Sequence, residues 1–459
     1  MQSKFSPQVT PPLVYFAFYG VAILVLLAPA LWNGYPLLQY DTGGYLARWY
    51  EGYLVPSRST VFGLYLHAGE GWHFWPIVIL QCALTVWVIA LVLRACGLGD
   101  RPRVLLAIVA ALSAITTLPW LSSVLLTDIF AGLSVLALHL VIFRSGNLAH
   151  YEKCGLLLLI AFSAATHSAT MAMLLGLVIA GAFGTLIIRG LASVRGLLQG
   201  FTAIVLGACM VLAANFALSG KLMWTPGGWG IMFGRMLQDG IVARYLKDHC
   251  PDSSLKLCPY RADLPATADD FLWGYSVFNK LGRFDGLGDE MRTIALRSLT
   301  EYPLQQIETA AVATARQLTL VASGAGVNNR VWHTYGIIDR FVPFEGPAAY
   351  AARQQRGQLD FTAVNRLHVP VALASMVLVL CLLFRFRRSK FDDLALLAAT
   401  TTLAILANAF LCGALSGPHD RYGARIAWLA TFAVGLAVAR VLAGADNKRT
   451  SHRTVTSAP

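Results

Sequence analysis

The sequence predicts an all-α polytopic membrane protein with about ten transmembrane helices and a mostly helical extracytoplasmic segment between the seventh and eighth spans. Of the 459 residues, 56% are hydrophobic and only 13% are charged, whereas soluble domains carry about 25% charged residues. Apolar runs long enough to cross a bilayer recur along the chain. The net charge is +12, but basic residues recur in short clusters between the apolar runs, which indicates topology signals and no nucleic-acid partner.

The apolar runs place the predicted spans in order. The first run is predicted to be a retained span, although Ala28-Pro29-Ala30 resembles a signal-peptide cleavage site. The fifth and sixth runs could form one kinked element, because only the polar patch around His167 separates them. The ten predicted spans are 13–31, 74–93, 104–121, 128–143, 154–170, 172–188, 197–218, 367–384, 392–412 and 423–442.

The charges of the connecting loops predict the orientation. Five basic segments would be cytoplasmic if the N-terminus is inside, namely 94–103, 143–153, 187–196, 384–390 and 447–453. The positive-inside rule then predicts that both termini are cytoplasmic and that the first loop, about 32–73, lies outside. The resulting units are an N-terminal transmembrane module (1–218), an extracytoplasmic segment (219–366), C-terminal transmembrane helices (367–445) and a cytoplasmic tail (446–459).

The long outer segment shows signs of a folded structure. Apolar periodicity around 304–326 predicts an amphipathic helix on the membrane surface or under a cap. The alternative is an eleventh span, which would reverse the membrane orientation of every later segment. The basic cluster at 385–390 argues against this alternative. Cys250 and Cys258 are predicted to form a disulfide if the segment is extracytoplasmic. A metal site with His249 is the alternative, although no second pair of ligands is visible.

The first outer loop carries a candidate catalytic carboxylate, Asp41. Several aromatic side chains surround it in the sequence, and aromatic faces stack on sugar rings while a carboxylate can take a proton from an acceptor hydroxyl. The alternative is an interfacial aromatic belt with a solvated carboxylate. Arg48 and Arg58 lie on the same loop and could bind phosphate in bidentate fashion. They could equally be surface arginines or partners of Glu51.

Polar residues at span ends form the second set of candidates. Asp128 falls at the outer end of the fourth span, where a carboxylate is a functional signal or simply a helix cap. His167 could be functional or structural. In the last outer loop, Arg421 and Arg425 begin a helix against its dipole, which predicts an anionic partner: Asp420, another protein carboxylate or a lipid phosphate.

The layout resembles that of the GT-C superfamily of membrane glycosyltransferases, which take a sugar from a polyprenyl-phosphate carrier. The resemblance rests on Asp41 in the first outer loop and on Leu125-Leu126-Thr127-Asp128, which is similar to a motif of the protein O-mannosyltransferase and lipid A aminoarabinose transferase branch. It also rests on the polar break Thr166-His167-Ser168 and on Arg421-Tyr422 at the start of a late span. The segment 219–366 is not covered by the resemblance.

The resemblance implies roles for these residues. Asp41 would be the general base in an inverting transfer to a glycan, lipid or protein acceptor, and Asp128 would orient substrates or a basic partner. Whether a divalent cation such as Mg or Mn takes part is left open. The implied location is the bacterial inner membrane, with the active site facing the periplasm. The donor phosphate would be bound by Arg58, Arg421 and Arg48, and the substrates by Tyr45, His167, His419 and Tyr422.

Other functions use the same polar residues differently. A transporter or flippase for a lipid-linked saccharide needs no general base, and an oligosaccharide polymerase or ligase would depend on a base in the long late loop. A non-enzymatic scaffold would tolerate neutralisation of all outer charges. The sequence contains no Walker A loop, no convincing G-x-S-x-G elbow and no H-E-x-x-H zinc pattern.

Overall fold

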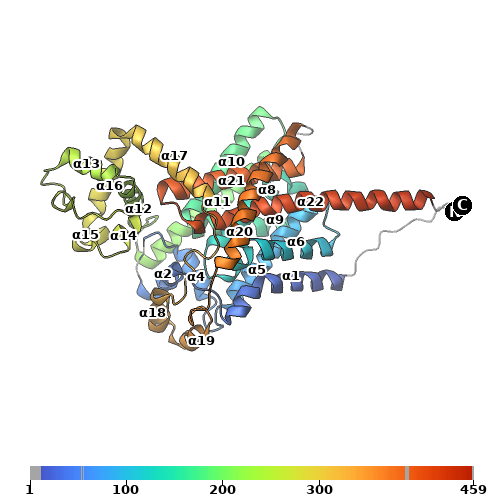
Figure 1. Ribbon diagram of the computed structural model, residues 1–459, viewed down its shortest axis with the longest axis horizontal. Coiled ribbons are helices and arrows are strands. Elements are labelled where there is room, and N and C mark those ends of the chain that lie inside the picture. Colours follow the sequence, from blue (N-terminus) through green and yellow to red (C-terminus); the bar gives the residue numbers. More distant parts are fainter. Residues whose placement is uncertain (1–11, 53, 55, 388–391, 457–459) are drawn as a thin grey trace.

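The computed structural model describes residues 12–52, 54, 56–387 and 392–456. Its regular secondary structure is helical throughout these residues, apart from one isolated bridge between Leu37 and Val124. The predicted all-α class is therefore confirmed (Figure 1). Within the described residues, seven helices are long and apolar enough to cross a membrane: α1 (Pro12–Asn33), α5 (Trp75–Ala95), α10 (Ser168–Ile187), α11 (Val194–Ser219), α20 (Thr362–Leu383), α21 (Asp393–Leu415) and α22 (Asp420–Thr456).

The three other predicted spans correspond to shorter helices, so the count of ten stays a prediction. The third run is divided because α6 (Pro102–Ile115) ends before α7 (Leu118–Ser123), which has a proline in its first turn. The fourth run forms α8 (Asp128–Phe143), which is buried among other helices along almost its whole length. The fifth forms α9 (His150–Thr166), and extended backbone at His167 separates it from α10.

The loops predicted to be cytoplasmic meet at one end of the bundle. Arg94 Nη1 donates to Glu152 Oε1 at 2.8 Å, and Arg144 pairs with Asp393. α1 begins and α22 ends at this same end, on the right of Figure 1. These contacts fit the grouping that the loop charges predict, while the side of the membrane on which they lie stays a prediction. Residues 388–390 of the basic cluster and 457–459 of the tail lie outside the described residues.

A helical unit with its own apolar core projects from the opposite end, on the left of Figure 1. Its core side chains lie between Phe233 and Tyr302. We call this unit the cap; its helices are α12 (Gly228–Gln238), α13 (Ile241–His249), α14 (Ala268–Leu272), α15 (Val277–Lys280) and α16 (Arg283–Glu301).

After the cap, α17 (Pro303–Thr319) packs along α21. It buries Ala313 and Gln317 against the bundle and exposes the apolar side chains of Leu304 and Ile307, which is the reverse of the distribution on a helix with a water-facing polar side. It is too short and too polar to count among the spanning helices, which argues against an eleventh span.

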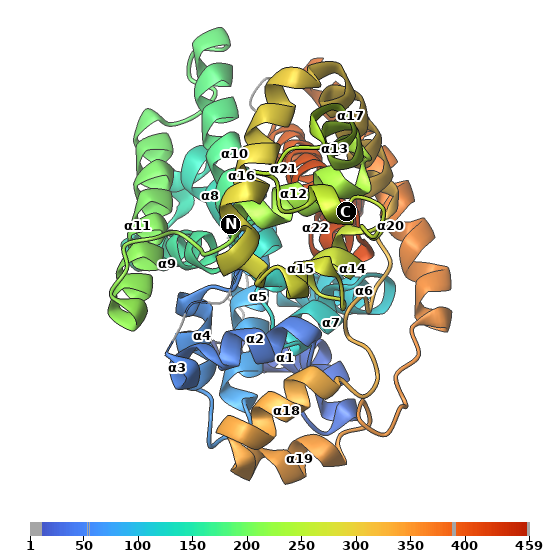
Figure 2. The same cartoon turned by 90° about the vertical axis from the view of Figure 1, so that its left-hand side faces the viewer.

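The residues between α17 and α20 fasten the loop at 32–73, predicted to be the first outer loop, to the bundle. α18 (Trp332–Phe341) packs beside α2 (Tyr40–Leu46), as Figure 2 shows. Glu345 is fully buried and accepts hydrogen bonds from Tyr35 and from the backbone N–H groups of Gly71 and His73. A buried carboxylate with this many donors holds both ends of the loop in place. The other short helices here are α3 (Arg48–Glu51), α4 (Thr60–His67) and α19 (Gly346–Ala351).

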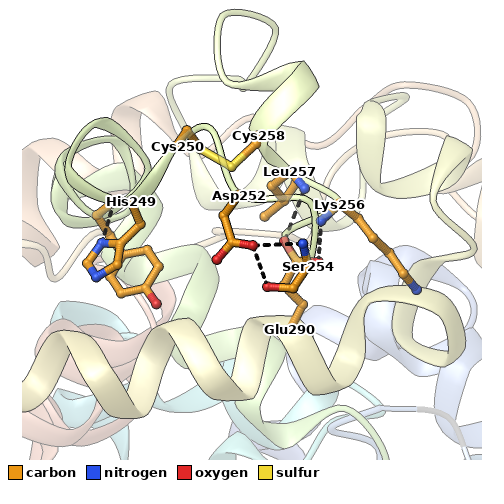
Figure 3. The surroundings of a disulfide bond; sticks show 9 residues. His249, Cys250, Asp252, Ser254, Lys256, Leu257, Cys258 and Glu290 are labelled. Atoms are coloured by element: carbon orange, nitrogen blue, oxygen red, sulfur yellow. Dashed lines mark hydrogen bonds between the residues drawn. A yellow bond between two sulfur atoms is a disulfide. The ribbon is translucent and has the colours of Figure 1, made fainter.

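The structure joins Cys250 and Cys258 by a disulfide within the cap (Figure 3). Between the cysteines, the backbone N–H groups of Lys256 and Leu257 donate to Glu290 on α16 at 2.8 and 3.0 Å. His249 Nδ1 lies 2.9 Å from the carbonyl oxygen of Tyr245. Both sulfurs are therefore bonded to each other, and this geometry does not support the alternative metal site.

Candidate functional site

The central feature of the end of the bundle that carries the cap is a chain of ion pairs built on two carboxylates. Arg421 Nη1 lies 2.5 Å from Asp41 Oδ2, and its Nε lies 2.6 Å from Asp128 Oδ2. Arg58 pairs with the second oxygen of Asp41. Arg425 Nη1 lies 3.7 Å from Asp128 Oδ1. Three guanidinium groups thus share two carboxylates, and we call these five residues the charged cluster.

Helix starts bring these side chains together. Asp41 lies in the first turn of α2, where the side chain of Gln39 accepts a hydrogen bond from its backbone N–H at 2.6 Å. Asp128 is the first residue of α8, and Arg421 is the second residue of α22. Carboxylates are favoured at helix N-termini by the dipole, whereas a guanidinium is not. The two carboxylates supply the anionic partner that the position of Arg421 predicts.

Asp420 was one of the candidate partners for Arg421, and its side chain lies elsewhere. Its Oδ1 accepts a hydrogen bond from the backbone N–H of Ala322 at 2.9 Å, just after α17. Nearby, Gln317 bonds both the backbone N–H and the carbonyl of His419. These contacts hold the start of α22 against the end of α17, which positions Arg421.

The inner half of the charged cluster is dry. Asp128 and Arg425 side chains are each 1% exposed. Asn408 on α21 accepts from Arg425 Nε and Nη2 at 3.0 and 2.7 Å and donates to the carbonyl of Tyr422 at 2.7 Å. Buried charges are costly unless they are paired and hydrogen-bonded. Breaking any of these contacts would therefore be unfavourable, and the geometry of this half is fixed.

The outer half is partly open. The Asp41 and Arg58 side chains are each 19% exposed, and Arg421 is 13% exposed. Burial raises the pKa of the Asp41 carboxyl, but Arg58 and Arg421 outweigh it and leave the pKa below its ordinary value. Asp41 is therefore ionised near neutral pH and accessible from the cap side.

Aromatic rings border this opening. The Arg58 guanidinium lies 5.8 Å from the ring centre of Tyr45 and 6.0 Å from that of Trp273 on the cap. Tyr45 is buried against Phe62, whereas Trp273 is exposed. Trp273 therefore places a partly exposed aromatic ring beside the Arg58 guanidinium at this opening.

The histidines and Tyr422 also lie at this end. His167, between α9 and α10, is close enough to Asp41 and to three arginines of the charged cluster to interact with them electrostatically. His419 Nε2 lies 3.8 Å from Asp269 on the cap, and both side chains are exposed. The ring of Tyr422 lies 5.8 Å from the Arg421 guanidinium. The structure thus gathers most of the predicted site residues around one opening.

Arg48 has different surroundings. Its side chain is 1% exposed, its Nε donates to the carbonyl of Gly44 at 2.6 Å, and its Nη2 lies 4.0 Å from Glu51. These contacts brace the loop between α1 and α5 and hold the Arg48 guanidinium away from solvent. Its predicted role in donor binding stays untested.

The donor set of the charged cluster does not suit a divalent cation. Such ions prefer several carboxylate or carbonyl oxygens, and here both carboxylates are held by guanidinium groups. Within the part of the chain that the structure describes, no group of three or more His, Cys, Asp or Glu side chains could hold a metal. We therefore derive no step through a metal.

Two residues of the site were not singled out from the sequence. Asn408 lies within an apolar run, and a lone amide there is a signal that could have been used. Trp273 lies in the cap, where no pattern relates it to Arg58, so only the fold reveals its position.

Comparison of the chain with family models, with curated proteins and with solved structures found no match. Function is therefore inferred from the charged cluster, from its position at one end of a membrane bundle and from the sequence motifs.

Proposed function

We propose that the protein is a glycosyltransferase that moves a sugar from a polyprenyl-phosphate donor to an acceptor hydroxyl on the outer face of the membrane. One observation carries the proposal: a single partly open carboxylate, Asp41, is held between two arginines at the end of an apolar helix bundle. A base beside two phosphate-binding groups is the combination that this reaction needs.

The reaction follows from these groups. The acceptor oxygen attacks the anomeric carbon as Asp41 takes the hydroxyl proton, and a new carbon–oxygen bond forms. The bond between that carbon and the phosphate oxygen breaks, and its electron pair leaves with the polyprenyl phosphate. Arg58 and Arg421 stabilise the negative charge on the departing phosphate. A single displacement of this kind inverts the anomeric centre.

Donor binding also prepares the base. Asp41 is a weak base while two guanidinium groups hold it, because they lower its pKa. A phosphate that binds Arg58 competes for the same nitrogens, which loosens one ion pair and raises the basicity of Asp41. Proton abstraction is thus favoured when the donor is present.

Asp128 acts through Arg421. It is 1% exposed and lies 2.6 Å from Arg421 Nε, on the side away from the opening. It therefore fixes the direction of the guanidinium group and leaves Nη1 aimed at Asp41. We assign Asp128 as a positioning residue.

The proposal is tested by mass spectrometry of lipid extracts and envelope glycans. Four strains are compared: a deletion of the gene, and the deletion complemented by wild type, by Asp41→Asn or by Asp263→Asn. Asp263 is the matched control because it is an exposed aspartate that follows α13. We expect the deletion and Asp41→Asn strains to accumulate one polyprenyl-phosphate sugar and to lack one glycan residue.

The control and wild-type strains should show the same normal profile. A normal profile with Asp41→Asn, at equal protein level, would show that Asp41 is not the base. That outcome would favour a transporter of a lipid-linked saccharide, which needs no proton acceptor.

A further inference from the structure

A groove of about 560 Å³ lies between α1 and α6, and none of the residues of the charged cluster lines it. Small side chains of two helices form its floor: Ala28 on α1, and Ala110 and Ala114 on α6. Val25, Pro29, Ser113 and Pro119 complete the walls. A groove of this size is within the range of small-molecule and lipid sites.

The groove runs along the outer halves of the two helices. On α1 it extends from Val25 to Trp32, close to the end of the helix at Asn33. On α6 it extends from Ala110 to Ala114, close to the end at Ile115. Because α1 is long and apolar enough to span the membrane, the inner part of the groove faces hydrocarbon. A lipid chain is the occupant that such a site meets in a bilayer.

The outer end of the groove has a different composition. Trp32 and Trp120 line it there, and tryptophan is enriched at the level of lipid headgroups. Arg353 lies with its guanidinium 5.3 Å from the Trp32 ring and donates to Gln358, another lining residue, at 3.3 Å. Two lining residues, Trp32 and Gln358, thus hold the Arg353 guanidinium at the mouth of the groove.

The charge around this mouth is positive. Residues 353–366 contain three arginines and one carboxylate, Asp360. Asp360 lines the groove, but its Oδ1 accepts the backbone N–H of Thr362 at 2.8 Å. An anionic headgroup therefore matches this end better than a zwitterionic one.

We infer that this groove is a binding site for an anionic phospholipid, with an acyl chain between α1 and α6 and the phosphate at Arg353. The bound lipid would join α1 to the outer segment that carries Arg353. This site is separate from the proposed glycosyl transfer and does not depend on it.

Native mass spectrometry of the detergent-purified full chain tests the inference. The probes are palmitoyl-oleoyl phosphatidylglycerol and, in parallel, palmitoyl-oleoyl phosphatidylcholine. We expect one phosphatidylglycerol to bind wild type, with an affinity about tenfold higher than that of phosphatidylcholine. Ala114→Phe fills the groove and should abolish this binding, whereas Ala111→Phe, on the same helix but outside the lining, should preserve it.

Arg353→Gln provides a second variant in case Ala114→Phe does not fold, because Arg353 is exposed. It should reduce phosphatidylglycerol affinity to that of phosphatidylcholine. The inference is overturned if Arg353→Gln leaves the preference unchanged, or if folded Ala114→Phe binds as wild type does. It is equally overturned if the purified protein retains a polyprenyl phosphate or a second copy of the chain at this groove.

Discussion

Asp41 and Asp128 share one guanidinium group, that of Arg421. Asp41 lies in α2 and Asp128 starts a buried helix, so they belong to different parts of the chain. Without the cation between them, two neighbouring carboxylates would repel each other and one would tend to take up a proton. Arg421 therefore holds a partly open and a dry carboxylate in one unit.

Arg421→Lys is predicted to separate activity from folding. Lysine keeps the positive charge but offers one compact ammonium in place of a planar fork, so it cannot bind both carboxylates in the same geometry. We expect loss of the glycan product with a fall of about 1–3 kcal/mol in the free energy of unfolding. The measurements are the glycan profile and thermal unfolding in detergent. Arg316→Lys, at an exposed position of α17, is the control, and normal product with Arg421→Lys would contradict the prediction.

Asp128→Asn is predicted to be the most destabilising neutralisation in the charged cluster. Arg425 and Arg421 would lose a carboxylate that is 1% exposed. Breaking a buried ion pair from one side costs about 3–5 kcal/mol. Thermal unfolding of the purified variant should show this loss, whereas Asp269→Asn, at an exposed aspartate, should unfold as wild type does. Equal stability of both variants would mean that Asp128 is not required to balance these arginines.

The pH dependence of stability reports on Asp41. Burial raises the pKa of its carboxyl, but Arg58 and Arg421 lower it further, so the folded pKa lies below the ordinary value of 3.8. A group with a lowered folded pKa stabilises the fold fully above its unfolded pKa and loses this contribution as the pH falls through the folded pKa.

The difference in unfolding temperature between wild type and Asp41→Asn should therefore stay constant from about pH 8 to about pH 5 and shrink below about pH 4. Thermal scans across this range make the measurement, and Asp269→Asn serves as the control. A difference that disappears between pH 7 and pH 5 would show that Asp41 is not held by the two arginines.

The sequence predicts the class of the fold because hydrocarbon requires long apolar helices, and such runs are visible one at a time. It predicts less about α6 and α8, since a helix that is surrounded by other helices need not have the length of a lipid-facing one. Asp41, Asp128 and Arg421 could be named because charge beside an apolar run is unusual. Their mutual contacts could not be predicted, because pairing depends on how α2, α8 and α22 meet.

The cap marks the limit of what the sequence predicts. Its apolar positions indicate helices, but no local pattern relates Trp273 to Arg58 or Glu345 to Tyr35. Arg48 shows the converse problem. Its sequence position resembles that of Arg58, and only the fold distinguishes a guanidinium that braces the loop from one at the opening.

Cysteine labelling in intact cells is predicted to place the cap outside. Tyr275 on the cap is 93% exposed, and Tyr151, among the loops at the opposite end, is 76% exposed. A background with Cys154, Cys209 and Cys381 changed to Ser removes the exposed free thiols. In that background, a membrane-impermeant maleimide should label Tyr275→Cys but not Tyr151→Cys, because the basic loops favour the cytoplasm.

Permeabilised cells supply the control, since both positions should then react. Labelling of Tyr151→Cys alone in intact cells would show that the charged cluster faces the cytoplasm. A donor presented on the outer leaflet could not then reach Asp41, and the proposed reaction would have to use a carrier on the inner leaflet.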